Sequence, residues 1–347
     1  MFFASDNAGP VHPRVMAALA AANDGYAAGY GADDLTARAV AQIREVFEAP
    51  EAAVHLVATG TAANALILAT LAAPWQTVFC APHAHIHEDE CGAPEFFSGG
   101  AKLTLVDGPE GRMAPDALAA ALQAAAGRGV HGVQPGPVSI TQASERGTIY
   151  SPEDIAAIAA VAHAHGQPLH MDGARFANAL VTAGCSPAEM TWRAGVDALS
   201  FGGTKNGLMG VEAAVIFDPG KARAFELRRK RGGHLFSKHR YLAAQMAAYL
   251  EDGLWLDLAA RANAAAAELE AGLRATGKAL ILHPREANML FVRWPRALHR
   301  RLKQAGAQYH IWEGGLDGDP DDPLTARLVC DWSADPAATA RFLALFA

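Results

Sequence analysis

Cysteine is scarce in this 347-residue sequence, which contains only Cys80, Cys91, Cys185 and Cys330. The four residues are widely separated and form no C-x-x-C pair. This pattern argues against a disulfide-stapled secreted domain and is typical of reduced thiols in a cytoplasmic protein.

Excess positive charge and long apolar runs are also absent. The formal net charge is −7, which argues against general nucleic-acid binding, because that function needs a basic face. No run approaches the roughly 18 apolar residues of a membrane span. The first residues have neither the basic segment nor the apolar core of a signal peptide. The sequence therefore predicts a cytoplasmic protein without a nucleic-acid or membrane partner.

Apolar segments of strand length alternate with segments of helical periodicity over most of the chain. Strands are expected at 53–57, 77–81, 102–106, 137–142, 167–171, 197–201 and 211–217. Helices are expected at 14–23, 33–48, 115–126, 152–165 and 187–194, with a further helical region at 221–250. Continuous apolar strands between helices predict an α/β fold, in which a mostly parallel sheet is covered on both faces.

The length of the chain is sufficient for two domains. We predict an irregular N-terminal arm at 1–13, a large domain at 14–250 and a smaller C-terminal α/β domain at 251–347. The smaller domain is expected to begin with a long helix at 254–275. Its strands are expected at 278–282, 288–293, 308–312 and 326–331, and its other helices at 296–305 and 336–346.

One lysine stands among glycines in Ser-Phe-Gly-Gly-Thr-Lys-Asn-Gly at 200–207, directly after a predicted strand. Glycines let a bulky ligand approach the backbone, so Thr204 and Lys205 are candidate cofactor-binding residues. A partly desolvated lysine loses its proton readily and becomes a nucleophile. Asp172 ends the preceding strand, in His-Met-Asp-Gly-Ala-Arg at 170–175. Pyridoxal phosphate (PLP) enzymes need this pair, since the lysine holds the cofactor aldehyde and the carboxylate keeps its pyridine nitrogen protonated.

A phosphate site is indicated by Thr59, Gly60 and Thr61, which lie between the strand at 53–57 and a helix that begins near Ala62. Free backbone N–H groups and the helix dipole favour an anion at such a position, and threonine hydroxyls add hydrogen bonds. An ordinary helix cap has the same local sequence. The lysine motif elsewhere in the chain favours the phosphate interpretation.

Three histidines alternate in His-Ala-His-Ile-His-Glu-Asp-Glu-Cys at 83–91. His83, His85 and His87 are of a residue type that can ligate a metal. Alternatively, one of them stacks on the cofactor ring and acts as an acid or base. A metal site would leave Lys205 without a role, so we favour the second interpretation and expect no metal.

At these motifs the sequence resembles the fold-type I PLP enzymes and, more narrowly, the low-specificity L-threonine aldolases. The aspartate at 172 and the lysine at 205, each in its motif, carry the resemblance, which runs from Ser5 to about Arg327. It implies a PLP-binding large domain and the cleavage of a β-hydroxy-α-amino acid to glycine and an aldehyde. Lys205, His85 and Asp172 are then the catalytic residues, with His85 stacked on the pyridine ring.

The resemblance also assigns roles to residues that would be uninformative alone. Glu90 follows His85 at the spacing of the family, and His83 is expected near the aldehyde. The substrate carboxylate is expected to bind Arg175, Arg327 and Ser5, and a guanidinium three residues after Asp172 is well suited to this contact.

Tyr30, Arg229 and Lys230 resemble positions that reach the cofactor phosphate from a neighbouring subunit. They imply a homodimer or homotetramer with its sites at the subunit interface. A solvated helix face is the alternative interpretation of the basic run at 228–231.

One segment departs from the family. Many threonine aldolases have Glu-Asn-Thr-His-Asn after the strand at 137–142, whereas this chain has Thr-Gln-Ala-Ser-Glu at 141–145. The histidine linked to recognition of the substrate hydroxyl is missing, and Gln142 is expected to contact the ring oxygen of the cofactor. We therefore expect threonine, allo-threonine or a bulkier substrate such as phenylserine. The alternatives are a β-eliminating lyase or aminotransferase of the same fold type, and a metal-dependent hydrolase built on the three histidines.

Overall fold

Seven strands form a large sheet, and its carboxyl edge carries the residues singled out above. The computed structural model describes residues 1–347, and the strand order of this sheet is β1-β7-β6-β5-β4-β2-β3. Only β7 runs antiparallel to its neighbours, so the predicted mostly parallel sheet is confirmed. The strands are β1 (Ala53–Val57), β2 (Gln76–Cys80), β3 (Lys102–Leu105), β4 (Gln134–Thr141), β5 (Leu169–Gly173), β6 (Ala198–Gly202) and β7 (Glu212–Ile216).

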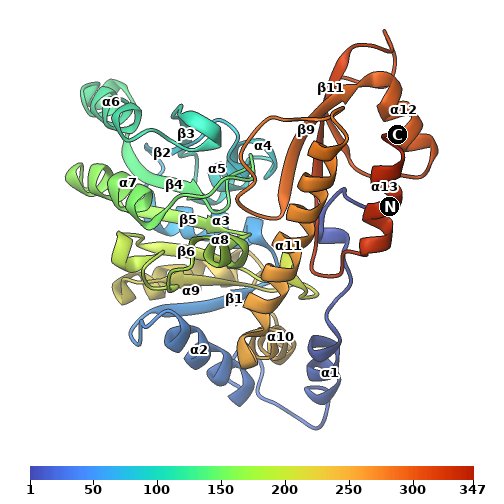
Figure 1. Ribbon diagram of the computed structural model, residues 1–347. Coiled ribbons are helices and arrows are strands. Elements are labelled where there is room, and N and C mark those ends of the chain that lie inside the picture. Colours follow the sequence, from blue (N-terminus) through green and yellow to red (C-terminus); the bar gives the residue numbers. More distant parts are fainter.

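Alternate residues of β1 belong to separate hydrophobic cores on the two faces of the large sheet. Ala53 and Val57 pack on one side with α3 (Gly60–Leu71) and α9 (Ala222–Arg231). Val54 and Leu56 belong to the core on the other side. That core is covered by α2 (Asp34–Val46), α6 (Pro115–Ala126), α7 (Pro152–Ala164), α8 (Phe176–Ala183) and α10 (Arg240–Leu250), as Figure 1 shows. The helices α1 (Pro13–Ala21), α4 (His85–Glu88) and α5 (Ala93–Ser98) complete this part of the chain.

The C-terminal part has its own antiparallel sheet, with the strand order β10-β11-β9-β8. Its elements are α11 (Leu254–Ala275), β8 (Leu280–Ile281), β9 (Met289–Pro295), α12 (Arg296–Gln304), β10 (His310–Glu313), β11 (Pro323–Val329) and α13 (Pro336–Ala344). The first half of α11 packs in the large core through Trp255, and its second half packs in the small core through Leu269 (Figure 1). None of the helices combines the length and the apolar character that crossing a membrane requires.

Two expectations about helices were wrong. The segment 187–194 forms turns and one short 3-10 helix, Trp192–Ala194, although Ser186 and Glu189 cap each other's backbone as at a helix start. Only a few residues separate this start from Gly195, which is too short a stretch for a stable helix. Conversely, α8 was not expected, because its N-cap residue Arg175 provides no side-chain cap. The region 221–250 is two helices, separated after Arg231.

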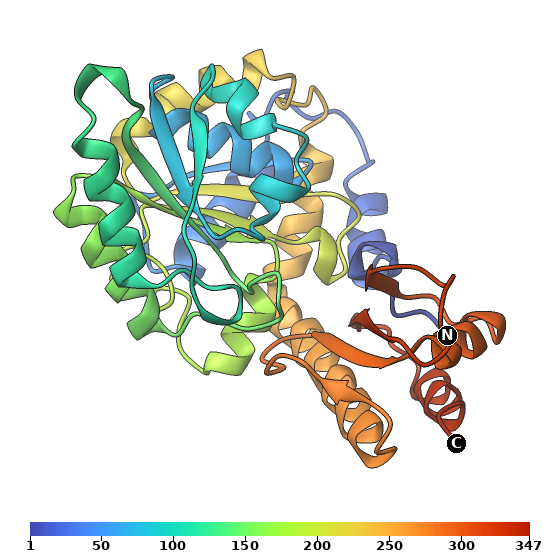
Figure 2. The ribbon, with the colours of Figure 1, turned by 90° about the horizontal axis from the view of Figure 1, so that it is seen from above.

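The N-terminal arm joins the two parts of the chain. Phe3 packs on Phe342, and its N–H donates to the Gln308 carbonyl at 2.7 Å, so the arm lies against the small sheet (Figure 2). A few residues later, Asp6 accepts two hydrogen bonds from Arg175 of the large domain, at 2.7 and 2.9 Å. Burial opposes the charge of Asp6, but Arg175, Lys205 and these hydrogen bonds hold its pKa below the usual value.

We predict that Asp6→Ala strongly destabilises the protein. The substitution leaves the buried Arg175 guanidinium without its partner, which typically costs about 3–5 kcal/mol of unfolding free energy. Urea unfolding of the two proteins measures the difference. The matched control is Glu226→Ala, which breaks the exposed ion pair to Arg223 and should cost less than about 1 kcal/mol. Similar losses in both variants would contradict the anchoring role of Asp6.

Candidate active site

A pocket of about 320 Å³ lies where the segments after β1, β5 and β6 meet. It is lined by Asn7, Ala58, Thr59, Gly60, Thr61, Asn64, His85, Asp89, Asp172, Ala174, Thr204, Lys205 and Glu212. Seven of these residues are candidates from the sequence: Thr59, Gly60, Thr61, His85, Asp172, Thr204 and Lys205. Strands that run in one direction bring them to one edge of the sheet, although they are far apart in the chain.

Lys205 lies in a single 3-10 turn, Thr204–Asn206, that follows β6. Asn206 fixes the turn, because its side chain donates to the Tyr249 hydroxyl at 2.7 Å and to the Trp255 carbonyl at 2.8 Å. Gly207 ends the turn with a φ of 96°, which a glycine adopts without strain. The glycine-rich sequence thus serves to place the lysine amine at the edge of the sheet.

The turn at Thr59, Gly60 and Thr61 begins α3. The Thr59 hydroxyl caps the helix by accepting the Ala62 N–H at 3.1 Å. The N–H groups of Gly60 and Thr61 are the first two of the helix and have no acceptor within it. Unpaired donors at the positive end of a helix dipole favour a phosphate.

A chain of hydrogen bonds joins Asp172 to His85. Asn64 donates to Asp172 at 2.8 Å and to Glu90 at 2.9 Å. Glu90 bonds to Nδ1 of His85 at 2.8 Å, and this bond raises the pKa of the imidazole although burial opposes it. The other oxygen of Asp172 accepts the Ala174 N–H at 3.0 Å. His85 therefore keeps its Nε2 for the pocket.

The other two histidines of the segment do not line the pocket. His83 contacts Glu88 through Nδ1 at 3.1 Å and Arg146 through Nε2 at 2.9 Å. His87 contacts the Pro82 carbonyl through Nδ1 at 3.0 Å. Alternate residues of a helical turn point in different directions, so the three histidines do not converge on one point. His83 was expected near the aldehyde, but it does not line the pocket of its own chain.

The two arginines expected to bind the substrate carboxylate differ in their surroundings. Nε and Nη2 of Arg175 both donate to Asp6, so this edge of its guanidinium is not free for the substrate carboxylate. Arg327 has no carboxylate partner. Its buried Nε has no acceptor, and its Nη2 reaches only the Ala4 carbonyl, at 3.4 Å. Burial and the nearby Arg175 lower the pKa of Arg327.

Tyr30, Lys230 and Arg229 lie outside the pocket of their own chain. Tyr30 is 54% exposed, and the Lys230 amine lies 4.8 Å from the centre of its ring. Arg229 is buried and donates to the Leu56 carbonyl at 3.3 Å, in the strand β1 that precedes the turn at 59–61. Their expected contact with a cofactor phosphate therefore requires a neighbouring subunit.

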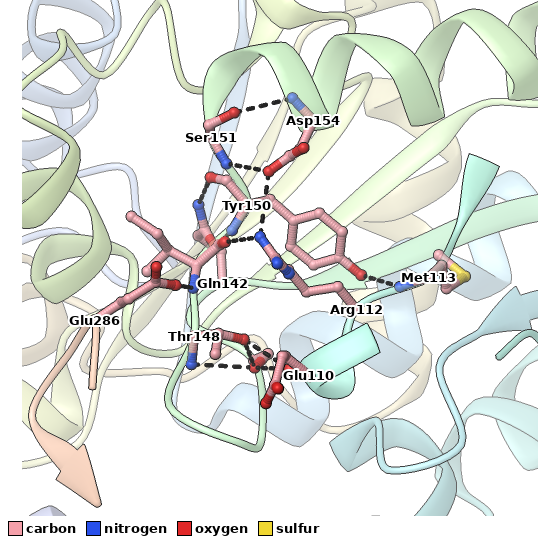
Figure 3. Close-up of polar contacts among 11 residues, drawn as sticks. Glu110, Arg112, Met113, Gln142, Thr148, Tyr150, Ser151, Asp154 and Glu286 are labelled. Atoms are coloured by element: carbon pink, nitrogen blue, oxygen red, sulfur yellow. Dashed lines mark hydrogen bonds and ion pairs between the residues drawn. The ribbon is translucent and has the colours of Figure 1, made fainter. Parts of the chain in front are cut away.

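Gln142 was expected to contact the cofactor, but it does not line the pocket, and Figure 3 shows its side chain bonded within its own loop. Its side chain accepts the Tyr150 N–H at 3.0 Å and donates to the Tyr150 carbonyl at 2.8 Å. The Tyr150 hydroxyl in turn accepts the Met113 N–H at 2.7 Å. The segment that departs from the family is thus a closed loop, and Gln142 holds its two ends together.

Glu212 is a pocket residue that sequence reasoning missed. It begins β7, where its backbone lies between Val57 of β1 and Gly202 of β6. Its carboxylate accepts the Gly203 N–H at 2.6 Å. Burial raises the pKa of Glu212 to about 7. A glutamate at the start of an otherwise apolar strand was the available signal.

Three more pocket residues were not found from the sequence: Asn7, Asn64 and Asp89. Asn64 stands alone among apolar residues of α3, which marks it in retrospect. Asn7 is positioned by Ser5, whose hydroxyl accepts the Asn7 N–H at 3.2 Å. Ser5 therefore caps the short turn Asp6–Ala8 at the pocket.

The chain matches known proteins over most of its length. The β-eliminating lyase family model matches residues 3–295. The low-specificity L-threonine aldolase of Pseudomonas aeruginosa is 42% identical over 339 residues, which cover 96% of this chain and 93% of that protein. The enzyme of the same name from a Pseudomonas species is 39% identical over 335 residues, with 96% and 94% covered.

A solved structure of threonine aldolase from Leishmania major has a TM-score of 0.92 at 29% identity, and the match covers 99% of this chain and 98% of that one. These matches confirm the predicted fold-type I architecture, and the predicted cofactor, PLP, is that of the family. The chain belongs to the low-specificity L-threonine aldolase family.

Proposed function

We propose that the protein cleaves L-threonine, L-allo-threonine and related β-hydroxy-α-amino acids to glycine and an aldehyde. The observation that carries this function is one pocket that contains Lys205, Asp172 and the N-terminus of α3. An amine, a carboxylate and an anion site are the three contacts that PLP requires. Product analysis with threonine tests the proposal, because an aldolase yields glycine and acetaldehyde. A keto acid as product would instead indicate a β-eliminating lyase or an aminotransferase.

The volume of the pocket and the chemistry of its lining residues both fit PLP. The volume, about 320 Å³, lies within the range of ligand sites, roughly 300–1,000 Å³. The N–H groups of Gly60 and Thr61 would hold the phosphate, Lys205 the aldehyde and Asp172 the ring nitrogen. When bound, PLP supplies the electron sink for the pair released as the Cα–Cβ bond breaks.

Asp172 and His85 act on different protons of the reaction. Asp172, oriented by Asn64 and Ala174, keeps a proton on the ring nitrogen. Nε2 of His85 accepts the proton of the substrate hydroxyl, while Glu90 on Nδ1 stabilises the resulting imidazolium. A base oriented by a carboxylate behind it is a common catalytic arrangement.

Arg327 is the main group for the substrate carboxylate. Its guanidinium has no anionic partner in the chain, whereas Arg175 has only its Nη1 uncommitted. Arg175 therefore anchors the N-terminal arm, and mainly its Nη1 group remains for the substrate. Binding of the carboxylate fixes the Cα–Cβ bond relative to the ring, which is where orientation accelerates the reaction.

We also propose a homodimer or homotetramer in which Tyr30, Lys230 and Arg229 complete the site of a neighbouring subunit. The exposure of Tyr30 and its contact with Lys230 support this assembly. Light scattering measures the mass of the oligomer and so distinguishes these assemblies.

The four cysteines form no disulfide, which supports a cytoplasmic location for the protein.

Lys205→Ala is expected to abolish covalent attachment of the cofactor and to lower kcat by ~10³-fold or more, since the amine is lost. Borohydride reduction followed by peptide mass analysis detects the attachment. Lys102→Ala, on an exposed strand, is the control and should behave as the parent. Substantial aldolase activity in the Lys205 variant would refute the assignment.

Arg327→Gln and Arg175→Gln should have different effects. The first is expected to raise KM for threonine by about 10- to 100-fold, because charge-assisted hydrogen bonds to the carboxylate are lost. The second leaves Asp6 buried without its partner, so it should mainly lower the free energy of unfolding. Steady-state kinetics and urea unfolding separate the two. An unchanged KM in Arg327→Gln would exclude that residue from substrate binding.

Glu212→Gln should make the stability of the cofactor-free protein less dependent on pH. The pKa of Glu212 is raised from 4.5 to about 7 in the folded state. The folded state therefore binds more protons between these values, and stability is lost as pH rises through that window. Between pH 5 and pH 8 the variant should gain up to about 3 kcal/mol relative to the parent. Urea unfolding at both pH values tests this, with the exposed Glu153→Gln as the control, and parallel pH profiles would refute it.

A further inference from the structure

Asn64 lies between two buried carboxylates. Its Nδ2 group donates to Oδ2 of Asp172 at 2.8 Å and to Oε1 of Glu90 at 2.9 Å. The three side chains belong to residues that are 1–3% exposed. Because ionised carboxylates only accept hydrogen bonds, the amide must direct its nitrogen toward both of them. The reaction proposed above uses Asn64 only to orient Asp172 and gives its bond to Glu90 no role.

The two carboxylates pose an electrostatic problem. One ring nitrogen of His85 and one carboxylate oxygen from each of Glu90 and Asp172 lie within 4.8 Å of one another. Burial raises the pKa of Glu90, and the charge of Asp172 raises it further. Two like charges at this separation disfavour each other's ionised form. The other titratable groups that face the pair are Lys205, Asp89, His170 and Arg175.

We propose that Asn64 is a positioning residue that assigns the two carboxylates different tasks. One N–H supports the ionised form of Asp172, which must receive the ring nitrogen of the cofactor. The other N–H keeps Glu90 directed at Nδ1 of His85. A neutral amide does this without a positive charge, which would compete with the ring nitrogen for Asp172. The inference rests on the proposed function for the roles of Asp172 and His85.

Loss of the amide has a specific consequence. In Asn64→Leu, a change to an apolar side chain of similar size, both carboxylates lose a donor that favours their charged form. Glu90, whose pKa burial and the charge of Asp172 already raise, then retains its proton to higher pH, because the Asn64 hydrogen bond no longer opposes these effects. The pH titration of the visible absorption of the bound cofactor and the acid limb of kcat/KM should both move up by about one unit or more. A packing role alone would lower stability and leave both pH profiles in place.

The experiment compares Asn64→Leu in the parent and in a Glu90→Gln background. With the second carboxylate absent, the substitution should move the absorption titration less than half as far. Equal movement in both backgrounds, or none in either, would overturn the proposal. Asn64→Ser keeps one O–H donor and should give an intermediate shift, which preserves the test if the leucine variant does not fold.

A buried amide elsewhere provides the matched control. Asn178 is buried on α8 and bonds to Asn263 at 3.0 Å, away from the pocket. Asn178→Leu should lower stability without moving either titration, and a shift as large as that of Asn64→Leu would overturn the proposal. The absorption titration needs no substrate. If Asn64→Leu shifts the absorption titration as expected but the parent protein releases no glycine from threonine, only the proposed reaction is refuted. Aldolase activity whose pH profile ignores Asn64→Leu would refute only the role of Asn64.

Discussion

Buried negative charge at the carboxyl edge of the large sheet is the constraint on which the site depends. Asp6, Glu90, Asp172 and Glu212 belong to residues that are only 3–7% exposed. Asp6 alone has a guanidinium partner, whereas the others are held mainly by amide and imidazole nitrogens. Lys205 is the only lysine or arginine that lines the pocket. The buried carboxylates are thus hydrogen-bonded mainly by neutral groups. Their negative charge remains to be neutralised by Lys205 and by the ring nitrogen of a bound cofactor.

The same constraint explains why the N-terminal arm belongs to the site. Asp6 pairs with Arg175 of the large domain and also accepts the Asn288 side-chain N–H of the small domain at 3.1 Å. One buried carboxylate therefore holds three parts of the chain together. Asn7, next to Asp6 in the arm, lines the pocket, and Arg327 of the small domain reaches the arm at the Ala4 carbonyl. Substrate binding and interdomain packing consequently depend on a single charged cluster.

The sequence was sufficient to predict the elements whose signals are local. The strand at 53–57 and the helices at 115–126 and 254–275 have the expected bounds, because apolar runs and helical periodicity are strong there. The start at Ser186 also carried a true capping signal, but cap geometry does not determine helix length. The helix α8 is stabilised by burial of residues such as Phe176 rather than by a cap, so it left no local signal.

Side-chain direction was the part of the site that could not be predicted. Lys205 and Asp172 reach the pocket because strand ends determine their position, whereas Gln142 makes its hydrogen bonds within its own loop. Asn64 could be recognised only after Asp172 and Glu90, distant in sequence, were seen on either side of it. Polar residues in apolar segments are marked by the sequence, but their partners are set by tertiary packing.

The directions of the histidine side chains determine which of them can contact the substrate hydroxyl. Both ring nitrogens of His83 are engaged, and the loop at 142–150 offers no histidine in its place. Nε2 of His85 is then the only imidazole nitrogen in the pocket that can contact the hydroxyl. A single hydrogen bond, made from one direction, separates the two β-configurations by a few kcal/mol at most. With His85 as the one imidazole in the pocket, we expect relaxed selectivity at Cβ, and strict selectivity would require a second polar group that contacts the hydroxyl from the opposite side of the substrate.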